Sequence, residues 1–201
     1  MPSRTTRIFA VLVVAAALGL AALALLRRDA DGPGGSGTAL VGGPFTLVDH
    51  NGRTATEAAF RGKHMLVFFG FTFCPDVCPT ELQVMAEALD SMGAAGQSIV
   101  PVFVTIDPER DTPEVMKAYV ANFGARFVGL TGTPEQIAAM ARAYRVYYKK
   151  LPGSAGADYL MDHSSIIYLM GPDGRFVKHF TYTTDAKALA AGLSAAIAAS
   201  P

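Results

Sequence analysis

Cys74 and Cys78 are the only two cysteines in the 201-residue sequence, and three residues separate them. Two thiols this close can oxidise to a disulfide, or they can bind a soft metal ion as thiolates. The spacing is one residue wider than the Cys-x-x-Cys motif of thiol–disulfide oxidoreductases, and the wider loop lets both sulfurs turn towards one ion. From the cysteines alone, disulfide chemistry and metal binding therefore both stay open.

The cysteine segment is predicted to join a strand to a helix. Met65–Phe71 is an apolar run typical of a short, fully buried strand, and Glu81–Met92 has the pattern of a helix. Pro79 stands where the first helical residue is expected. Cys78 would then lie at the helix N-terminus, where unpaired N–H groups and the macrodipole favour a thiolate.

The rest of the chain predicts one α/β domain. The other expected elements are a hairpin formed by 45–49 and 53–56, strands at 99–106, 127–130, 146–149, 165–170 and 175–180, and helices at 113–123, 134–144 and 185–199. A strand–turn–helix that carries paired cysteines within this order is a thioredoxin-type arrangement. We therefore expect a thioredoxin-like mixed sheet flanked by helices on both faces, with an N-terminal β-hairpin extension.

His163 is the third candidate ligand. Thioredoxins place a proline beside the active disulfide, just before the hairpin strand, and here that place holds Met161-Asp162-His163-Ser164. The fold is therefore expected to bring an imidazole to the face that holds both thiols. Two thiolates and one imidazole suit copper, especially Cu(I), far better than magnesium or calcium, and zinc would normally take a fourth ligand. Three further hypotheses concern neighbouring residues: Met161 as a thioether ligand, Asp162 as a hydrogen-bond acceptor for the imidazole, and Asp76 as a charge between the thiols.

A charged loop, Asp107–Glu114, follows the second core strand. Thr112 and Pro113 predict the N-cap and the first residue of the next helix. The loop is either simply solvated or a docking surface, since it leaves the end of a parallel strand, where α/β sheets place their sites. His50, in a turn, and His64, before a strand, are expected to be solvated structural histidines.

The N-terminal segment predicts a membrane anchor. Ile8–Leu26 has nineteen residues without charge or proline, close to the roughly 20 that span a bilayer. The alternative, a cleaved signal peptide, would have an apolar region of only ~7–15 residues. We expect an anchor at 1–28, a glycine-rich tether at 29–40 and the folded domain at 41–201.

Composition excludes several other classes of function. The formal net charge is zero, which gives no electrostatic case for binding nucleic acid. Two cysteines are also too few for a four-cysteine zinc or iron–sulfur site.

Four segments resemble the Sco/SenC family, in the same order and spacing between about 45 and 180: Phe71 to Thr80, Asp107 to Pro113, Phe127 to Thr133, and Asp162-His163-Ser164. The resemblance implies a thioredoxin-like copper protein, anchored in the bacterial inner membrane with its domain in the periplasm, that serves the assembly of cytochrome c oxidase. It implies that Cys74, Cys78 and His163 bind copper, as Cu(I) or Cu(II). The implied recipient is the CuA site of oxidase subunit II, and a copper donor chaperone and a thioredoxin-like reductant are the other implied partners.

Three functions are compatible with these residues. The leading hypothesis is a copper metallochaperone, a binding and transfer protein rather than a catalyst. The alternatives are a thiol–disulfide oxidoreductase that keeps the CuA cysteines reduced, and a redox or copper sensor. All three would use the same thiolates, so no residue of the sequence belongs to only one of them.

Overall fold

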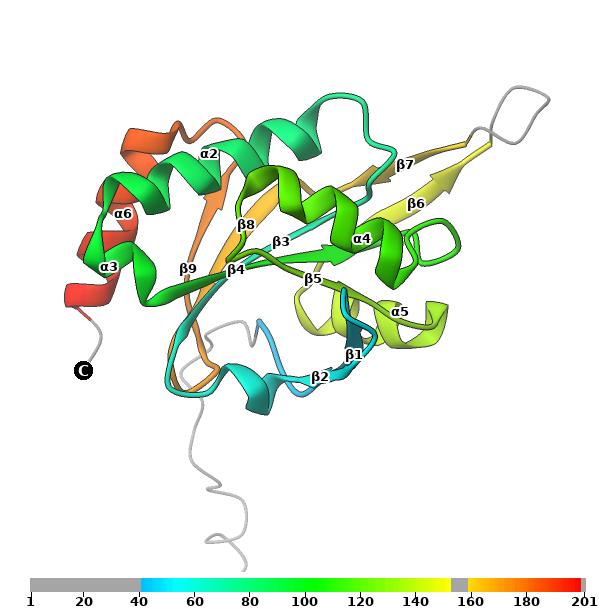
Figure 1. The fold of residues 1–201 in the computed structure, drawn as a ribbon, viewed down its shortest axis with the longest axis horizontal. Coiled ribbons are helices and arrows are strands. Elements are labelled where there is room, and N and C mark those ends of the chain that lie inside the picture. Colours follow the sequence, from blue (N-terminus) through cyan, green and yellow to red (C-terminus); the bar gives the residue numbers. More distant parts are fainter. Residues whose placement is uncertain (1–40, 153–158, 200–201) are drawn as a thin grey trace, which may run out of the picture. The chain divides into compact units, whose positions relative to one another are not determined.

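The computed structural model describes residues 41–152 and 159–199 (Figure 1). Within these two ranges, no helix is long enough and apolar enough to cross a membrane. The predicted anchor at 1–28 and tether at 29–40 lie outside the described residues.

The described part of the chain contains the strands and helices that the sequence predicts, with two additions. The strands are β1 (Thr46–Asp49), β2 (Thr54–Thr56), β3 (His64–Gly70), β4 (Ile99–Thr105), β5 (Val128–Thr131), β6 (Tyr148–Leu151), β7 (Leu160–His163), β8 (Ile166–Met170) and β9 (Phe176–Thr181). The α-helices are α2 (Val77–Ser91), α3 (Ala94–Gln97), α4 (Pro113–Val120), α5 (Pro134–Ala143) and α6 (Ala186–Ala198), and short 3₁₀ turns cover Glu57–Phe60 and Ala121–Phe123. Strand β7 and the short helix α3 are the additions, since no element was expected at 160–163 or at 94–97.

Seven strands form one mixed sheet in the order β2-β1-β5-β4-β3-β8-β9. Strand β4 runs parallel to β3 and β5, and the remaining pairs are antiparallel. The predicted hairpin extension is present as β1 and β2, which join the sheet through β5. Strand β6 was expected as an edge strand, but it pairs with β7 in a separate two-stranded sheet.

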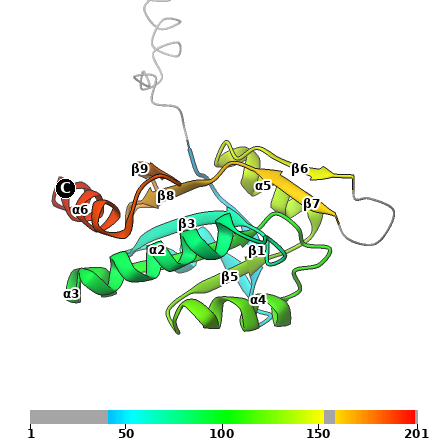
Figure 2. The same cartoon turned by 90° about the horizontal axis from the view of Figure 1, so that it is seen from above.

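Helices cover both faces of the main sheet. Helices α2 and α4 lie on one side and α5 on the other (Figure 2), and α6 packs beside α2. Every residue of the central strand β3 is buried, as its continuous apolar run predicts. For this reason His64, at the start of β3, is buried rather than solvated. His50 is also structural rather than free, because its Nδ1 accepts the Gly129 N–H at 3.0 Å and so ties the hairpin turn to β5.

Helix starts follow their capping residues. Thr112 accepts the N–H of Val115 and caps α4, with Pro113 as the first helical residue, as predicted. Asp185 caps α6 by accepting the Ala188 N–H at 2.7 Å. Helix α2 differs: it begins at Val77, so Pro79 is its third residue rather than its first. Proline is tolerated there because none of the first N–H groups of a helix has an intrahelical acceptor.

Candidate metal centre

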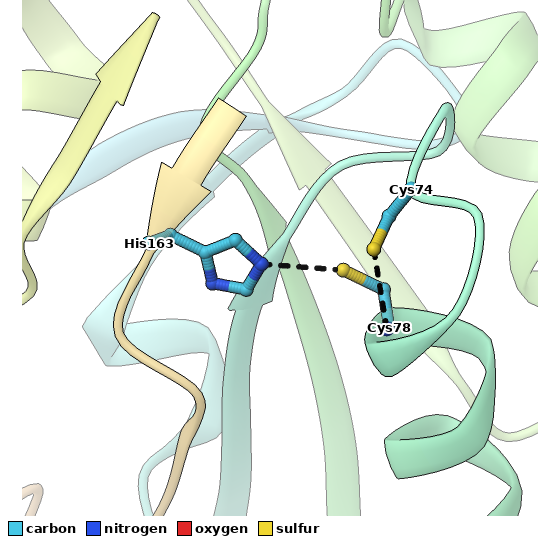
Figure 3. Close-up of side chains that lie close together, drawn as sticks. All are labelled: Cys74, Cys78 and His163. Atoms are coloured by element: carbon cyan, nitrogen blue, oxygen red, sulfur yellow. Dashed lines mark hydrogen bonds between the residues drawn. The ribbon is translucent and has the colours of Figure 1, made fainter. Parts of the chain in front are cut away.

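Three side chains from three segments meet at the carboxyl end of β3 (Figure 3). Cys74 lies in the loop after β3, Cys78 in the first turn of α2, and His163 at the end of β7. Their potential ligand atoms all lie within 4.8 Å of one another, and Cys78 Sγ is 3.4 Å from His163 Nε2. The structure thus brings together the three residues that the sequence predicts as ligands.

Gly70 makes room for the buried thiol. Cys78 is fully buried, because the first turn of α2 packs over the end of β3. A Cβ atom at Gly70 would lie only 2.7 Å from Cys78 Sγ and 2.9 Å from the ring of Phe103. The glycine before the cysteine segment is therefore required by a close approach rather than by a turn conformation.

The two thiols differ in acidity. A side-chain hydrogen bond with Cys78 is the main cause that lowers the pKa of Cys74 to about 4, and the backbone N–H groups of Asp76 and Cys78 lower this pKa further. The same hydrogen bond, followed by burial and the charge of Cys74, raises the pKa of Cys78. The Cys78 N–H points at Cys74 Sγ, 3.4 Å away. In the copper-free site the negative charge therefore lies on the half-exposed Cys74 rather than on Cys78, mainly because the Cys78 thiol hydrogen-bonds to it and also because amides at the start of α2 point at its sulfur.

His163 presents one nitrogen to the thiols. Its ring packs edge-on against Phe68 and Phe71, at centroid distances of 6.2 and 6.0 Å. Its Nδ1 lies 3.1 Å from the carbonyl oxygen of Ser164. A carbonyl can only accept a hydrogen bond, so Nδ1 carries the proton and the lone pair of Nε2 faces the sulfurs. The ring is therefore held in the tautomer that a metal ligand at Nε2 requires.

Behind the thiols, Asp111 joins the ends of three strands. Its fully buried carboxylate accepts hydrogen bonds from Thr72 Oγ1 at 2.6 Å, from the Thr72 N–H at 3.1 Å and from Thr105 Oγ1 at 2.5 Å. Its carbonyl oxygen accepts from Thr131 Oγ1 at 2.7 Å. Burial raises the pKa of this carboxyl, against the opposing effect of its hydrogen bonds. The charged loop is therefore not simply solvated, because part of it supports the cysteine segment from inside.

Comparison with known proteins places the chain in a family. The SCO1/SenC family model matches residues 33–198. The chain belongs to the SCO1/SenC family. The human mitochondrial SCO1 homolog is 47% identical over 146 residues, which cover 72% of this chain and 48% of that protein. The bovine mitochondrial SCO2 homolog is 42% identical over 194 residues, covering 92% and 73% of the two chains. The chain thus spans about half the length of the SCO1 relative described here.

Solved structures of SCO1/SenC proteins share the fold. ScoI of Arabidopsis thaliana with copper bound is 44% identical, with a TM-score of 0.75, and covers 79% of this chain and 98% of that one. ScoI of Bradyrhizobium japonicum with copper bound is 46% identical, with a TM-score of 0.71, and covers 77% and 98%. Copper-bound yeast Sco1 is 37% identical, with a TM-score of 0.75, and covers 80% and 90%. These likenesses confirm the family resemblance and the thioredoxin-like α/β fold.

In this SCO1/SenC chain, the carboxylates of Asp76 and Asp162 lie outside the cluster of potential ligand atoms. Asp162 is exposed on β7 opposite Lys149, and the carbonyl of Ser164 takes the role of acceptor for the imidazole. Asp76 is an exposed N-cap of α2. Met161 is partly buried and lines a groove of about 350 Å³ beside the loop that carries Glu109.

Sequence reasoning missed one buried acid near the site. Glu81, one turn after Cys78 on α2, is only 2% exposed, and its Oε2 has no hydrogen-bond partner among the described residues. Burial raises the pKa of this carboxyl. A charged residue close to a helix N-terminus normally indicates an exposed first turn, so its burial between packed elements had no signal in the sequence.

Proposed function

We propose that this chain is a copper metallochaperone, and that Cys74, Cys78 and His163 hold the copper as cargo. The observation that carries the proposal is the convergence of two sulfurs and an unprotonated imidazole nitrogen within 4.8 Å. Thiolate and imidazole donors match the preference of copper, and hard cations would require oxygen ligands. Family members 37 to 46% identical have been solved with copper bound.

The three donors differ in accessibility, which gives an order to the transfer. Cys78 is fully buried, whereas Cys74 and His163 are partly exposed. An incoming ligand from a recipient would therefore approach the copper from the side of Cys74 and His163, and the bond to Cys78 would break last. Each step exchanges one ligand for another with no change in oxidation state, and loading the site releases the proton that Cys78 carries.

Family membership implies the recipient and the location. The proposed recipient is the CuA site of cytochrome c oxidase subunit II, with a copper donor and a thioredoxin-like reductant as further partners. The proposed location is the bacterial inner membrane, with the domain in the periplasm and the apolar segment at 8–26 as an uncleaved anchor. Alkaline carbonate extraction tests the anchor: the full chain should stay in the membrane pellet, and a soluble mature form that begins after residue 24 would refute it.

A second function, thiol–disulfide exchange, is favoured by the asymmetry of the thiols. An exposed cysteine whose pKa is lowered to about 4 is a ready thiolate, and the buried partner, whose pKa is raised, can resolve a mixed disulfide. The same pair could therefore reduce the CuA cysteines before they receive copper.

The variant His163→Ala separates the two functions, because a disulfide needs only the sulfurs. It should leave Cys74 and Cys78 able to cycle between dithiol and disulfide. It should weaken copper binding markedly, and more for Cu(II) than for Cu(I), since two thiolates alone can hold Cu(I). The exposed His179 on β9 offers a matched control, and His179→Ala should change neither property.

Oxidase maturation in cells then decides between the roles. If CuA assembly fails in His163→Ala cells while thiol cycling persists, copper delivery is supported. If assembly proceeds normally without the imidazole, and Cys74→Ser still blocks it, the chain acts as a thiol reductase and the metallochaperone proposal is wrong.

A further inference from the structure

The imidazole of the candidate site is carried by an element that stands apart from the main sheet. Strands β6 and β7 pair only with each other among the described strands, through Tyr148↔His163 to Leu151↔Leu160. A two-stranded hairpin by itself is marginally stable in water. Side-chain contacts between the hairpin and the body of the domain therefore help to fix the position of His163 relative to the sulfurs.

Arg110 makes such contacts to both sides at once. Its guanidinium carbon lies 3.7 Å from the ring centroid of Tyr159, the residue that precedes β7, and its Nη1 donates a hydrogen bond to the Tyr159 carbonyl at 2.9 Å. The same guanidinium lies 4.8 Å from the ring of Phe73, the residue that precedes Cys74. One cation is thus stacked between the segment that carries a thiol and the segment that carries the imidazole.

Arg110 is itself held in place by a buried acid. Its Nε donates to Asp107, whose side chain is only 3% exposed. Asp107 also accepts a hydrogen bond from the Tyr159 hydroxyl at 2.6 Å. The arginine side chain is only 23% exposed, and cation–π attraction is stronger when the cation is shielded from water.

A second cation reinforces the same connection. Lys150, on β6, forms an ion pair with Glu109 at 2.7 Å and lies 3.7 Å from the ring centroid of Tyr159. Lys150 and Glu109 are about half exposed, so this pair contributes less than the shielded contacts of Arg110.

We propose that Arg110 is a positioning residue, which sets the place of the His163 imidazole relative to Cys74 by clamping Tyr159 and Phe73 on its guanidinium. The effect on copper rests on the proposed function, but the effect on the hairpin does not. Arg110 touches none of the three donor atoms, so it acts on them only through the segments it connects.

The first test uses the copper-free protein and hydrogen exchange of backbone amides. In Arg110→Met, which keeps a long apolar side chain without the cation, the amides of Tyr148–Leu151 and Leu160–His163 should exchange about tenfold faster, the size expected from loss of shielded cation–π contacts. Exchange in β3 should not change. Tyr159→Leu, which removes the ring from the other side of the clamp, should reproduce the effect.

The matched control is Arg126→Met. Arg126 also has a largely covered side chain, 22% exposed, and pairs with Asp90 at 2.5 Å, but it lies on the α2–α4 side, away from the hairpin. This variant should leave the hairpin amides at wild-type rates. Equal hairpin exchange in wild type and Arg110→Met would overturn the proposal, as would equal acceleration in Arg126→Met.

The second test is a double-mutant cycle on copper affinity, measured by competition with a Cu(I) or Cu(II) chelator. Arg110→Met should weaken binding about tenfold in the wild-type background and have no further effect in the His163→Ala background. Arg110→Lys should restore part of the affinity, because it keeps the cation but cannot stack as a plane or reach the Tyr159 carbonyl with the same geometry. An equal loss in both backgrounds would refute positioning, since Arg110 would then act on the fold or on the thiols alone.

The two tests separate this proposal from the proposed function. If the hairpin loosens in Arg110→Met while the wild-type protein fails to bind copper, the clamp stands and the metallochaperone function is refuted. If copper binds and the hairpin does not loosen, the function stands and the clamp is refuted.

Discussion

Adding one methyl group at Gly70 should displace the buried thiol and damage the proposed copper site. The Cβ of an alanine there would lie 2.7 Å from Cys78 Sγ, whereas ordinary contacts begin at about 3.4 Å, so the difference of about 0.7 Å must be taken up by movement. The same Cβ would lie 2.9 Å from the ring of Phe103, so a second side chain would also have to move. Overpacking of this kind typically costs about 1–3 kcal/mol of stability.

The effect on copper should exceed the effect on folding. Metal–ligand distances are normally kept to within about 0.2 Å, so a shift of about 0.7 Å in Sγ, worked from the same contact, is too large to be absorbed. We expect Gly70→Ala to weaken Cu(I) binding by about 10- to 100-fold, the range seen when the support of a ligand is removed. The assays are urea denaturation of the copper-free protein and chelator competition at one pH.

Gly192→Ala is the control for overpacking itself. A Cβ at Gly192, on α6, would lie 2.5 Å from the ring of Phe180, so this variant is also strained, but far in sequence from the ligand set. It should lose stability and keep wild-type copper affinity. If Gly70→Ala binds copper like the wild type, or if both variants lose affinity in proportion to stability, the reasoning that links Gly70 to the thiol is refuted.

Two further predictions follow from the shifted pKa values. The pKa of Cys74 is lowered to about 4, so the rate at which iodoacetamide alkylates it in the reduced, copper-free protein should stay nearly constant from pH 8 down to about pH 5. Mass spectrometry can follow this reaction, and the buried Cys78 should react slowly throughout. A Cys74 rate that falls tenfold per pH unit below pH 8 would contradict the prediction. Burial raises the pKa of Glu81 in the folded protein. As pH rises, the Glu81 carboxyl therefore ionises in the unfolded state before it ionises in the folded state, so the free energy of unfolding decreases between the ordinary pKa and the raised one. In urea denaturation between pH 4 and 8, Glu81→Gln should remove this decrease in the free energy of unfolding, and the variant should be most stable relative to the wild type at pH 8. The same pH dependence in both proteins would show that the carboxyl is not buried in solution.

The main fold could be predicted because its signals are local. The continuous apolar run before the cysteines indicated a central strand, and Thr112-Pro113 and Thr133-Pro134 marked two helix starts that the structure confirms. A strand overlapping β6 was predicted at 146–149, but its partner β7 and their separate two-stranded sheet were not. Strand β7 has only four residues, two of them polar, so the sequence pattern did not distinguish it from a loop.

The candidate ligands were predictable, but their support was not. Cys74, Cys78 and His163 were recognised by residue type and by their places in a thioredoxin-like order, and the structure brings them together. Asp111 and Arg110 were read only as parts of a charged loop, because the sequence does not show that one carboxylate is buried and one cation is stacked on aromatic rings. The sequence also could not show which cysteine carries the charge. Position at the helix N-terminus favours a thiolate at Cys78, but burial of Cys78 and the hydrogen bond between the two thiols favour a thiolate at Cys74.

The candidate ligand atoms of the proposed site are therefore held with different rigidity. Cys78 rests on the buried end of β3 and on the first turn of α2, so moving its sulfur would disturb the core. His163 is carried by a two-stranded hairpin outside the main sheet, and Arg110 connects this hairpin to the cysteine segment. Because His163 is partly exposed on this hairpin whereas Cys78 is fully buried, we expect the imidazole to be the donor that leaves copper at the lowest free-energy cost. Copper would then stay on the two sulfurs with an open position on the exposed side, which is the arrangement that a recipient's ligand needs in order to enter.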